Sequence, residues 1–379
     1  MISSSRNLVF KSLLLAIIFL FSCVNQSSKQ KGKLVLNEEG FFNTEREYKS
    51  FSNHFLDSLK AFFPIDFNGT VLVYKQGKLF KKAFGEIGLA HSPEMLVDDV
   101  FQLASVSKTV TAVATMVLIQ EGKLALDSLV LRYLPDFPYP NVTIRQLLTH
   151  RSGIVNYMYY TDTFWKDTAR YMNNEDLYHF MKVSKPIPSL NPGAGFSYCN
   201  TNYAFLAYLI SKISGLPFHQ FVEERIFKPA GMRNSFYLGY KPERIKARVL
   251  IGRLSHHEYN EPYYMDGILG DKSLYSNVED MFYFHLALSE GRLINKTLLN
   301  LMQEPSFQHN VYGGSYGLGF RLMKNYTGQW TYHNGWWRGF WTSFWNRFDQ
   351  QVCVVVLTNS KHSSHVDKQG LANFVLTGR

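Results

Sequence analysis

Cysteine is scarce in this sequence, which has only Cys23, Cys199 and Cys353 among its 379 residues. So few thiols exclude a small domain held together by several disulfides, and we expect Cys199 and Cys353 to be free and buried. Histidine, cysteine and acidic residues form no cluster with metal-ligand spacing. No glycine-rich phosphate loop follows a predicted strand either. We therefore expect no metal ion and no other cofactor.

The apolar run near the N-terminus is too short to cross a membrane. Leu13–Phe21 has nine residues and follows Arg6 and Lys11, whereas a spanning helix needs ~20. This pattern is typical of a secretory signal peptide, which we expect over residues 1–22. Cys23 ends the run, and the segment LFSC resembles a bacterial lipobox, in which the cysteine is lipid-modified. An ordinary cleavable signal with a chance cysteine is the alternative.

Lipidation at Cys23 would make the protein an exported bacterial lipoprotein. It would be anchored to a membrane and face the periplasm or the cell exterior. Residues 24–33 read VNQSSKQKGK, a polar composition typical of a flexible tether. We expect a lipid-anchored tether over residues 23–45.

Acidic residues are fewer than basic ones, 30 against 40, and the formal net charge is +10. No basic run with interleaved aromatic residues occurs, so we expect no nucleic-acid partner. The excess charge could hold the protein near anionic lipids or cell-wall polymers. A basic surface spread over the whole molecule explains it as well.

Both ends of the main domain show strand patterns. From Thr70, apolar and polar residues alternate around Gln76-Gly77, which predicts a hairpin that opens the ordered domain. Near the C-terminus, aromatic and β-branched runs separated by turn residues predict further strands at Thr331–His333, Phe340–Phe348 and Gln351–Thr358.

The middle of the chain shows helical periodicity instead. One helix begins near Val106 and ends at Gly122, and a second follows Tyr203 and ends at Gly215. We therefore predict an α+β fold, an antiparallel sheet formed by both chain ends, flanked by helices and with a largely helical insertion. The catalytic domain would span residues 46–379, with the sheet from about 67–100 and 315–379 and the helical part from about 101–314.

Ser105 and Lys108 open the first predicted helix. A spacing of three places them on one face, about one turn apart. A serine hydroxyl needs a base to become a good nucleophile, and a lysine whose pKa is lowered by its surroundings can serve. The motif alone is weak evidence, because Ser28 and Lys31 have the same spacing in the predicted tether.

Tyr198-Cys199-Asn200 precedes the second helix in a segment rich in turn residues. Tyr198 could carry the proton of a leaving group, although Asn200 or Thr201 could merely cap the helix. Further Tyr-x-Asn matches, such as those at residues 171–173 and 275–277, show that the tripeptide alone decides nothing. A thiol reagent at Cys199 would block a cleft here.

His333-Asn334-Gly335 lies on a predicted strand. Gly335 would let a substrate approach the backbone, and the N–H groups of Trp336 and Ser105 could form an oxyanion hole. A strand histidine followed by a turn glycine is the simpler interpretation of this element alone.

The order of the three elements, and the text around them, resemble a known family. The chain is similar to the serine β-lactamase superfamily, within the group of class C β-lactamases, D-alanyl-D-alanine peptidases, D-amino acid amidases and related esterases. The resemblance covers roughly residues 67–359 and rests on the blocks FNGTVLVYKQGKLFKKAFG, FQLASVSKTVTA, VTIRQLLTHRSGI, PGAGFSYCNTNYAFLAYLISKISG, IFKPAGM, YGLGF and HNGWWRGF.

The resemblance implies roles for residues in these blocks. It implies a β-lactamase/transpeptidase-like fold in which Ser105 is acylated, Lys108 activates it and Tyr198 serves the leaving group. Asn200 and His333 would line the substrate cleft. His150, in LLTHRSGI, is expected to be structural.

One position departs from many relatives, which have Lys where this chain has His333. A histidine is largely neutral at pH 7, so the fixed cation is missing. Arg338 could replace it by binding a substrate carboxylate, or could equally turn to solvent. Some of the nearby tryptophans could form an apolar cleft wall, although core packing accounts for most of them.

The resulting hypothesis is a serine acyl hydrolase that works through an acyl-enzyme on Ser105. It would be a peptidase, amidase or esterase acting on D-amino acid peptides of cell-wall metabolism or on small esters. The alternatives are a penicillin-binding sensor or scaffold with little turnover and a true class C-like β-lactamase. The expected partners are the small substrate and, through the lipid anchor, a membrane.

Overall fold

The computed structural model describes residues 34–44, 46–88, 92–255, 258–260, 263–307 and 314–379. The predicted signal peptide 1–22, Cys23 and the first part of the predicted tether lie outside these residues. No helix in the described ranges is long and apolar enough to cross a bilayer.

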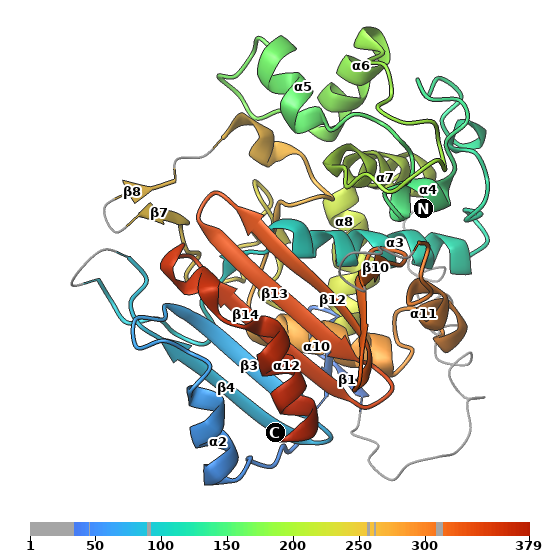
Figure 1. Ribbon diagram of the computed structural model, residues 1–379. Helices are drawn as coiled ribbons and strands as arrows, with labels where there is room; N and C mark the ends of the chain where they lie inside the picture. Colours follow the sequence, from blue (N-terminus) through green and yellow to red (C-terminus); the bar gives the residue numbers. More distant parts are fainter. Residues whose placement is uncertain (1–33, 45, 89–91, 256–257, 261–262, 308–313) are drawn as a thin grey trace, which may run out of the picture.

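A seven-stranded antiparallel sheet joins the two ends of the chain (Figure 1). β14 pairs with β3, so that Val355 lies opposite Leu72. At the turn between β3 and β4, Gln76 and Gly77 both have positive φ, the geometry of the predicted two-residue hairpin. In sheet order the strands are β10 (Gly314–Tyr316), β11 (Arg321–Asn325), β12 (Gly328–Trp337), β13 (Phe340–Arg347), β14 (Val352–Thr358), β3 (Gly69–Lys75) and β4 (Lys78–Phe84).

Helices cover both faces of this sheet. α2 (Asn53–Lys60) and α12 (Lys368–Thr377) lie on the face in front in Figure 1, where Val71 and Val354 pack against Leu371. Leu72 and Val355 point to the opposite face, toward α10 (Val278–Ser289). Because strand side chains alternate, consecutive residues of β3 and β14 belong to different cores.

A helical part lies above the sheet in Figure 1. Its central helix, α3 (Ser107–Gln120), is buried from Ser107 to Leu118. Its threonines remain compatible with that burial because their hydroxyls donate to backbone carbonyls. The other helices are α4 (Ile144–Leu148), α5 (Tyr157–Phe164), α6 (Asn174–Ser184), α7 (Asn200–Ser214), α8 (Phe218–Val222), α9 (Lys228–Ala230) and α11 (Lys296–Met302).

Five shorter helical segments complete the helical elements of the described ranges. They are η1 (Ala104–Val106), η2 (Val130–Arg132), η3 (Glu223–Phe227), η4 (Tyr264–Gly267) and η5 (His362–His365). α7 ends at Gly215 in the left-handed conformation, as predicted. The α+β fold with a sheet from both chain ends and a helical insertion is confirmed.

Several short elements differ from the sequence-based expectation. β1 (Leu34–Leu36) and β2 (Phe42–Thr44) form a hairpin inside the range expected to be a tether. Phe41, between them, is fully buried, with the Arg244 guanidinium 4.6 Å from its ring centroid. The ordered chain therefore begins before the hairpin at Gln76. These strands are too short for periodicity to reveal.

Five more short strands, of two or three residues each, form two small sheets within the expected helical part. β5 (Phe101–Gln102), β9 (Leu274–Ser276) and β6 (Phe236–Tyr237) make a three-stranded sheet, and β7 (Arg253–Ser255) pairs with β8 (Glu258–Tyr259). The first of these sheets lies directly before η1, where Ser105 is found.

Candidate active site

Ser105 and Lys108 are in contact. Ser105 lies in η1, Lys108 lies in the first turn of α3, and the lysine Nζ donates to Ser105 Oγ over 3.0 Å. Lys108 is fully buried, and its Nζ also donates to the backbone oxygen of Asp271 over 2.8 Å. A neutral amine held this close can take the hydroxyl proton as Ser105 attacks a carbonyl.

The backbone before Ser105 is held on both sides. The N–H of Leu103 donates to the oxygen of Leu274 in β9, and the hydroxyl of Thr342 in β13 donates to the Leu103 oxygen. Ala104 has a φ of +49°, which is uncommon for a residue with a side chain. This turn presents Ser105 at the N-terminal end of α3, where the helix dipole favours developing negative charge.

Gly335 brings β12 against η1. The pairing of β12 with β11 ends at Tyr332, so the backbone beyond it is available to meet η1. A Cβ on Gly335 would lie 2.4 Å from the oxygen of Leu103 and 3.0 Å from the nitrogen of Ser105. The Ser105 N–H is therefore adjacent to the strand that carries Trp336, as the predicted oxyanion hole requires.

The two tryptophans after Gly335 point in opposite directions, because strand side chains alternate. Gly335 and Trp337 belong to the face that meets η1, whereas the Trp336 indole is 63% exposed on the other face. The part of Trp336 that lies beside Ser105 is therefore its backbone rather than its indole. The Trp337 indole N–H donates to Asp266 Oδ1 over 2.6 Å.

Tyr198 lies beside Lys108, whose Nζ is 5.1 Å from its ring centroid. Asn200 is the first residue of α7, and its Nδ2 lies 2.7 Å from the Met158 sulfur. The helix has no side-chain cap, and the Thr201 hydroxyl donates to the oxygen of Val155 instead. The capping alternative for Asn200 and Thr201 is therefore wrong.

The Tyr-x-Asn matches at residues 171–173 and 275–277 lie elsewhere in the fold. Asn173 and Asn277 cap α6 and α10, where each side chain accepts a hydrogen bond from a backbone N–H. Neither of these two matches lies beside the Ser105–Lys108 pair, whereas Tyr198 of the match at residues 198–200 does.

His333 is buried, whereas the resemblance implied that it lines the substrate cleft. Its ring has no exposed surface, and both nitrogens have protein partners: Nε2 lies 3.0 Å from the Tyr316 hydroxyl and Nδ1 lies 2.7 Å from the Asn334 oxygen. The ring therefore offers no nitrogen to a ligand in this conformation. Burial lowers the pKa of His333 well below its usual value, and the charges of Arg321 and Lys108 lower it further.

Two arginines are candidates for the cation that His333 does not provide. The Arg338 guanidinium carbon lies 4.9 Å from the ring centroid of Tyr263. The Arg321 guanidinium carbon lies 5.2 Å from the ring centroid of Tyr198. Arg321 was not predicted as a site residue, although it directly follows the block YGLGF.

Cys199 and Cys353 are free and buried, as predicted. Burial raises the pKa of the Cys199 thiol, and buried thiols with a raised pKa react slowly. The hypothesis that a thiol reagent would block the cleft through Cys199 is not supported in this conformation.

A second buried lysine lies behind Lys108 and was also missed. Lys272 donates to the Tyr157 hydroxyl, which donates to Asp271 Oδ2 over 2.9 Å. The Lys272 Nζ lies 5.3 Å from the ring centroid of Trp337. Burial lowers the pKa of Lys272, while the charge of Asp271 raises it. The Asp271 backbone oxygen accepts a hydrogen bond from Lys108 Nζ. This cluster therefore helps to hold the proposed base in place.

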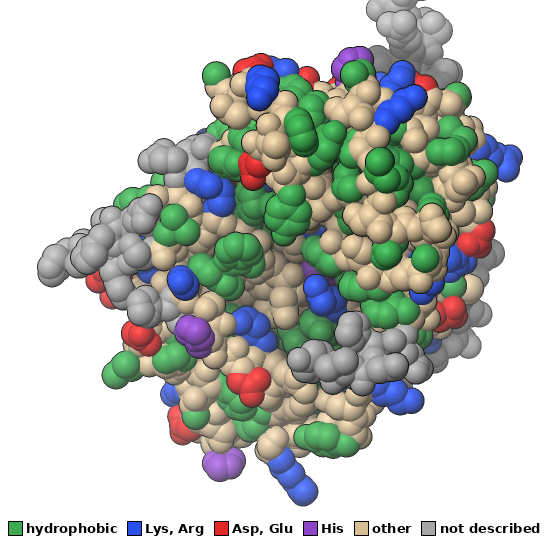
Figure 2. Space-filling view, turned by 45° about the horizontal axis from the view of Figure 1, so that its top comes forward, with side chains coloured by type: hydrophobic (Ala, Val, Ile, Leu, Met, Phe, Trp, Pro, Cys, Tyr) green, Lys and Arg blue, Asp and Glu red, His purple; other side chains and the backbone are tan. Residues whose placement is uncertain are grey.

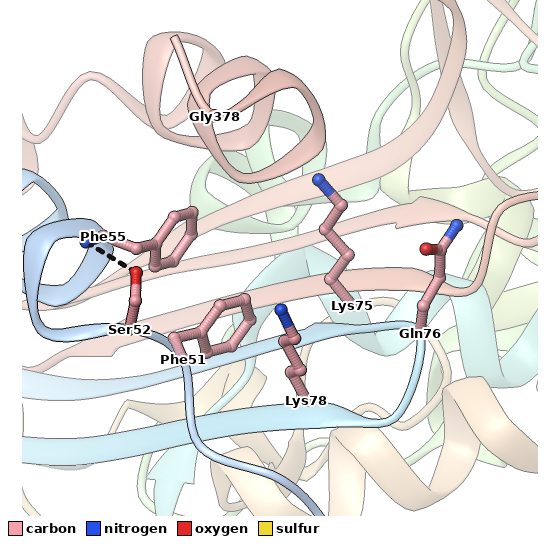
Figure 3. A pocket seen from close by; sticks show the side chains of 7 residues that line it. All are labelled: Phe51, Ser52, Phe55, Lys75, Gln76, Lys78 and Gly378. Carbon is pink, nitrogen blue, oxygen red and sulfur yellow. Dashed lines mark hydrogen bonds between the residues drawn. The ribbon is translucent and has the colours of Figure 1, made fainter.

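Figure 2 shows a hollow between the helical part and the sheet, with hydrophobic side chains at its border and basic side chains along its lower rim. A different hollow lies between α2, the β3–β4 turn and the end of α12, and Lys75 and Lys78 point into it (Figure 3). That hollow contains none of the predicted site residues. Within the described residues, no group of three or more His, Cys, Asp or Glu side chains could hold a metal ion.

The comparisons with known proteins agree with this geometry. Residues 67–376 match the family described as Beta-lactamase. The chain is 31% identical to penicillin-binding protein 4* of Bacillus subtilis over 83% of its own length and 73% of that protein, and 25% identical to a putative D-alanyl-D-alanine carboxypeptidase of Escherichia coli over 79% and 78%.

Solved structures show the same fold. A penicillin-binding protein from Bacillus halodurans has a TM-score of 0.71 and 24% identity, covering 86% of this chain and 99% of that one. A D-stereospecific amidohydrolase from Streptomyces has a TM-score of 0.67 and 25% identity, covering 86% and 98%. The chain therefore belongs to the Beta-lactamase family and is a serine acyl hydrolase.

Proposed function

We propose that the enzyme cleaves an amide or ester next to a D-amino acid through an acyl-enzyme on Ser105. The observation that carries this proposal is the contact of 3.0 Å between Lys108 Nζ and Ser105 Oγ. Ser105 Oγ attacks the carbonyl while Lys108 takes its proton. The carbonyl oxygen becomes an oxyanion, which the N–H groups of Ser105 and Trp336 would stabilise.

Collapse of this intermediate breaks the bond to the leaving group. Tyr198 passes a proton to the departing nitrogen or oxygen, and the acyl group stays on Ser105. Water then attacks the ester, releases the acid and restores the serine hydroxyl. Tyr198 suits this role because the Lys108 Nζ lies 5.1 Å from its ring centroid.

A D-amino acid peptide with a free C-terminal carboxylate is the proposed preferred substrate. Relatives of this chain include a putative D-alanyl-D-alanine carboxypeptidase and a D-aminopeptidase. Arg321 supplies a cation beside Tyr198, on the leaving-group side, and a guanidinium binds carboxylates well.

Hydrolysis assays test this function. We would compare a D-alanyl-D-alanine peptide, its C-terminal amide, an activated ester and a chromogenic cephalosporin. Wild-type protein should turn over the free peptide best, and Ser105→Ala should lose all turnover. Ser28→Ala, in the second Ser-x-x-Lys match, is the matched control and should retain activity. Best turnover of the cephalosporin would favour a class C-like β-lactamase instead.

We also propose that the protein is an exported lipoprotein anchored through Cys23. The support is in the sequence: basic residues, a nine-residue apolar run and the lipobox-like LFSC. Expression in a bacterium fed a fatty acid with a clickable alkyne should label wild-type protein. Cys23→Ala should be unlabelled and found in the soluble fraction. Equal labelling of both would contradict the proposal.

A further inference from the structure

Two histidines and a tyrosine form a buried row behind the proposed site. His150 follows α4, Tyr316 ends β10 and His333 lies in β12. Each is at most 1% exposed. The Tyr316 hydroxyl lies 3.2 Å from His150 Nε2 and 3.0 Å from His333 Nε2. We name these three residues the histidine bridge.

The partners at the two ends of the histidine bridge determine where its protons lie. The backbone N–H of Cys199 donates to His150 Nδ1 over 3.1 Å, so this nitrogen is an acceptor. At the other end, His333 Nδ1 lies 2.7 Å from the Asn334 carbonyl oxygen, which can only accept, so this nitrogen carries a proton.

With both imidazole rings neutral, only one orientation of the Tyr316 hydroxyl gives each of these nitrogens a hydrogen-bond partner. His150 donates from Nε2 to the Tyr316 oxygen, and Tyr316 donates its proton to His333 Nε2. His150 is thus protonated on Nε2 and His333 on Nδ1. The Tyr203 hydroxyl, which lies close by, donates to the oxygen of Leu148, so it does not compete for the Tyr316 oxygen as a donor.

The surroundings disfavour a charge on either ring. Lys108 and Arg321 are the cations that act on both histidines. The Tyr198 and Tyr203 rings pack against the His150 ring in tilted orientations, with centroids 4.3 Å and 5.1 Å away. The Asn202 amide lies 3.4 Å from His150 Nδ1, which is compatible with an acceptor at that nitrogen.

The ends of the histidine bridge reach the two walls of the site. Cys199 directly follows Tyr198, and Asn334 directly precedes Gly335. We propose that the histidine bridge is a positioning device, in which two neutral imidazoles with opposite tautomers fix the Tyr198 segment relative to the β12 strand. His333 is then a positioning residue rather than a substrate ligand. The positioning role rests on the proposed function, but the tautomers do not.

Nitrogen-15 NMR of the full chain labelled at histidine tests the tautomers directly. His150→Asn and His333→Asn would assign the two pairs of ring signals. We expect the Nε2–H form for His150 and the Nδ1–H form for His333 from pH 8 to pH 6. The same tautomer in both rings, or an imidazolium at pH 6, would overturn the proposal even if the enzyme is active.

Kinetics of Tyr316→Phe test the positioning role. This variant keeps the ring and removes the hydroxyl that joins the histidines. We expect kcat to fall by about tenfold or more with little change in KM, because the catalytic groups and not the binding groups are displaced. The histidine NMR signals should shift as well.

The matched control is Tyr139→Phe. Tyr139 is also buried, and its hydroxyl donates to the Pro186 oxygen over 3.3 Å. It should keep wild-type kcat at a similar cost in Tm. Equal kcat in both variants would overturn the positioning role, whereas absence of turnover in the wild-type protein would instead contradict the proposed function.

Discussion

The backbone nitrogen of Ser105 lies 3.0 Å from the position that a Cβ on Gly335 would occupy. The same Cβ would lie 2.3 Å from the Thr342 hydroxyl and 2.4 Å from the Leu103 oxygen. Since these neighbours are held by hydrogen bonds, a side chain here must push η1 away from β12.

Gly335→Ala should therefore lower kcat/KM by roughly 100-fold, as expected when catalytic groups move by about 1 Å. Steady-state kinetics on the preferred substrate measure the effect. Gly314→Ala is the control, because its Cβ would meet only the Leu322 oxygen at 3.6 Å. If both variants keep wild-type kinetics, β12 does not set the position of Ser105.

Arg321→Ala should raise KM for a peptide with a free C-terminal carboxylate by about tenfold, because a charge-assisted contact is lost. The effect on a neutral ester should be small. Arg338→Ala should affect both substrates equally, since its guanidinium lies over Tyr263. A selective effect of Arg338→Ala alone would restore the sequence-based hypothesis that Arg338 binds the carboxylate.

Lys272→Met should destabilise the fold by about 3 kcal/mol, because it leaves the buried Asp271 carboxylate without its cation. Activity should fall too, since the Asp271 backbone oxygen holds Lys108. Denaturant titration measures the first effect. Lys212→Met, which breaks an exposed pair with Glu175, should cost less than about 1 kcal/mol. Equal costs would mean that the buried cluster is not strongly coupled.

Acidification below about pH 6.5 should destabilise the protein. Burial lowers the pKa of His150 and His333 well below 6.5, and that of His285 to about 4. The unfolded chain therefore binds protons in this range while the folded chain does not, so stability falls as pH falls. Each histidine can contribute up to about 1.4 kcal/mol per pH unit.

Asp280 acts in the opposite direction, because burial raises its pKa to about 7. Its contribution favours folding at low pH and is lost as pH rises above about 4. Three histidines outweigh one aspartate between pH 4.5 and 6.5, so the net trend stands. Denaturant midpoints measured from pH 5 to pH 7.5 test it. Asp280→Asn should steepen the dependence, and His333→Asn should flatten it.

The local features of this site could be predicted from sequence, whereas its long-range contacts could not. The hairpin at Gln76, the helices after Ser105 and Tyr198, and the close approach at Gly335 follow from turn residues, periodicity and the lack of a Cβ. Arg321 and Tyr316 are brought to the site by strand pairing across the sheet edge, which no local pattern reveals.

The orientations of Trp336 and Trp337 were not predicted, although the sequence pattern contains the information. If Gly335 faces η1, strand alternation alone turns the Trp336 indole away and Trp337 inward. No sequence pattern indicates that His333 and Lys272 are buried, because their burial depends on neighbours from distant parts of the chain. The hairpin before residue 45 was missed because its strands have three residues each, fewer than a periodic pattern needs.

The central claim is that Ser105 carries the acyl group and Lys108 activates it. Intact-mass spectrometry after exposure to a fluorescent penicillin and to an activated ester measures this most directly, on protein that begins after Cys23. We predict an adduct that maps to Ser105 and then decays, slow formation in Lys108→Met and none in Ser105→Ala. An adduct that persists would favour a penicillin-binding sensor, and an equal adduct in Ser105→Ala would contradict the assignment of the nucleophile.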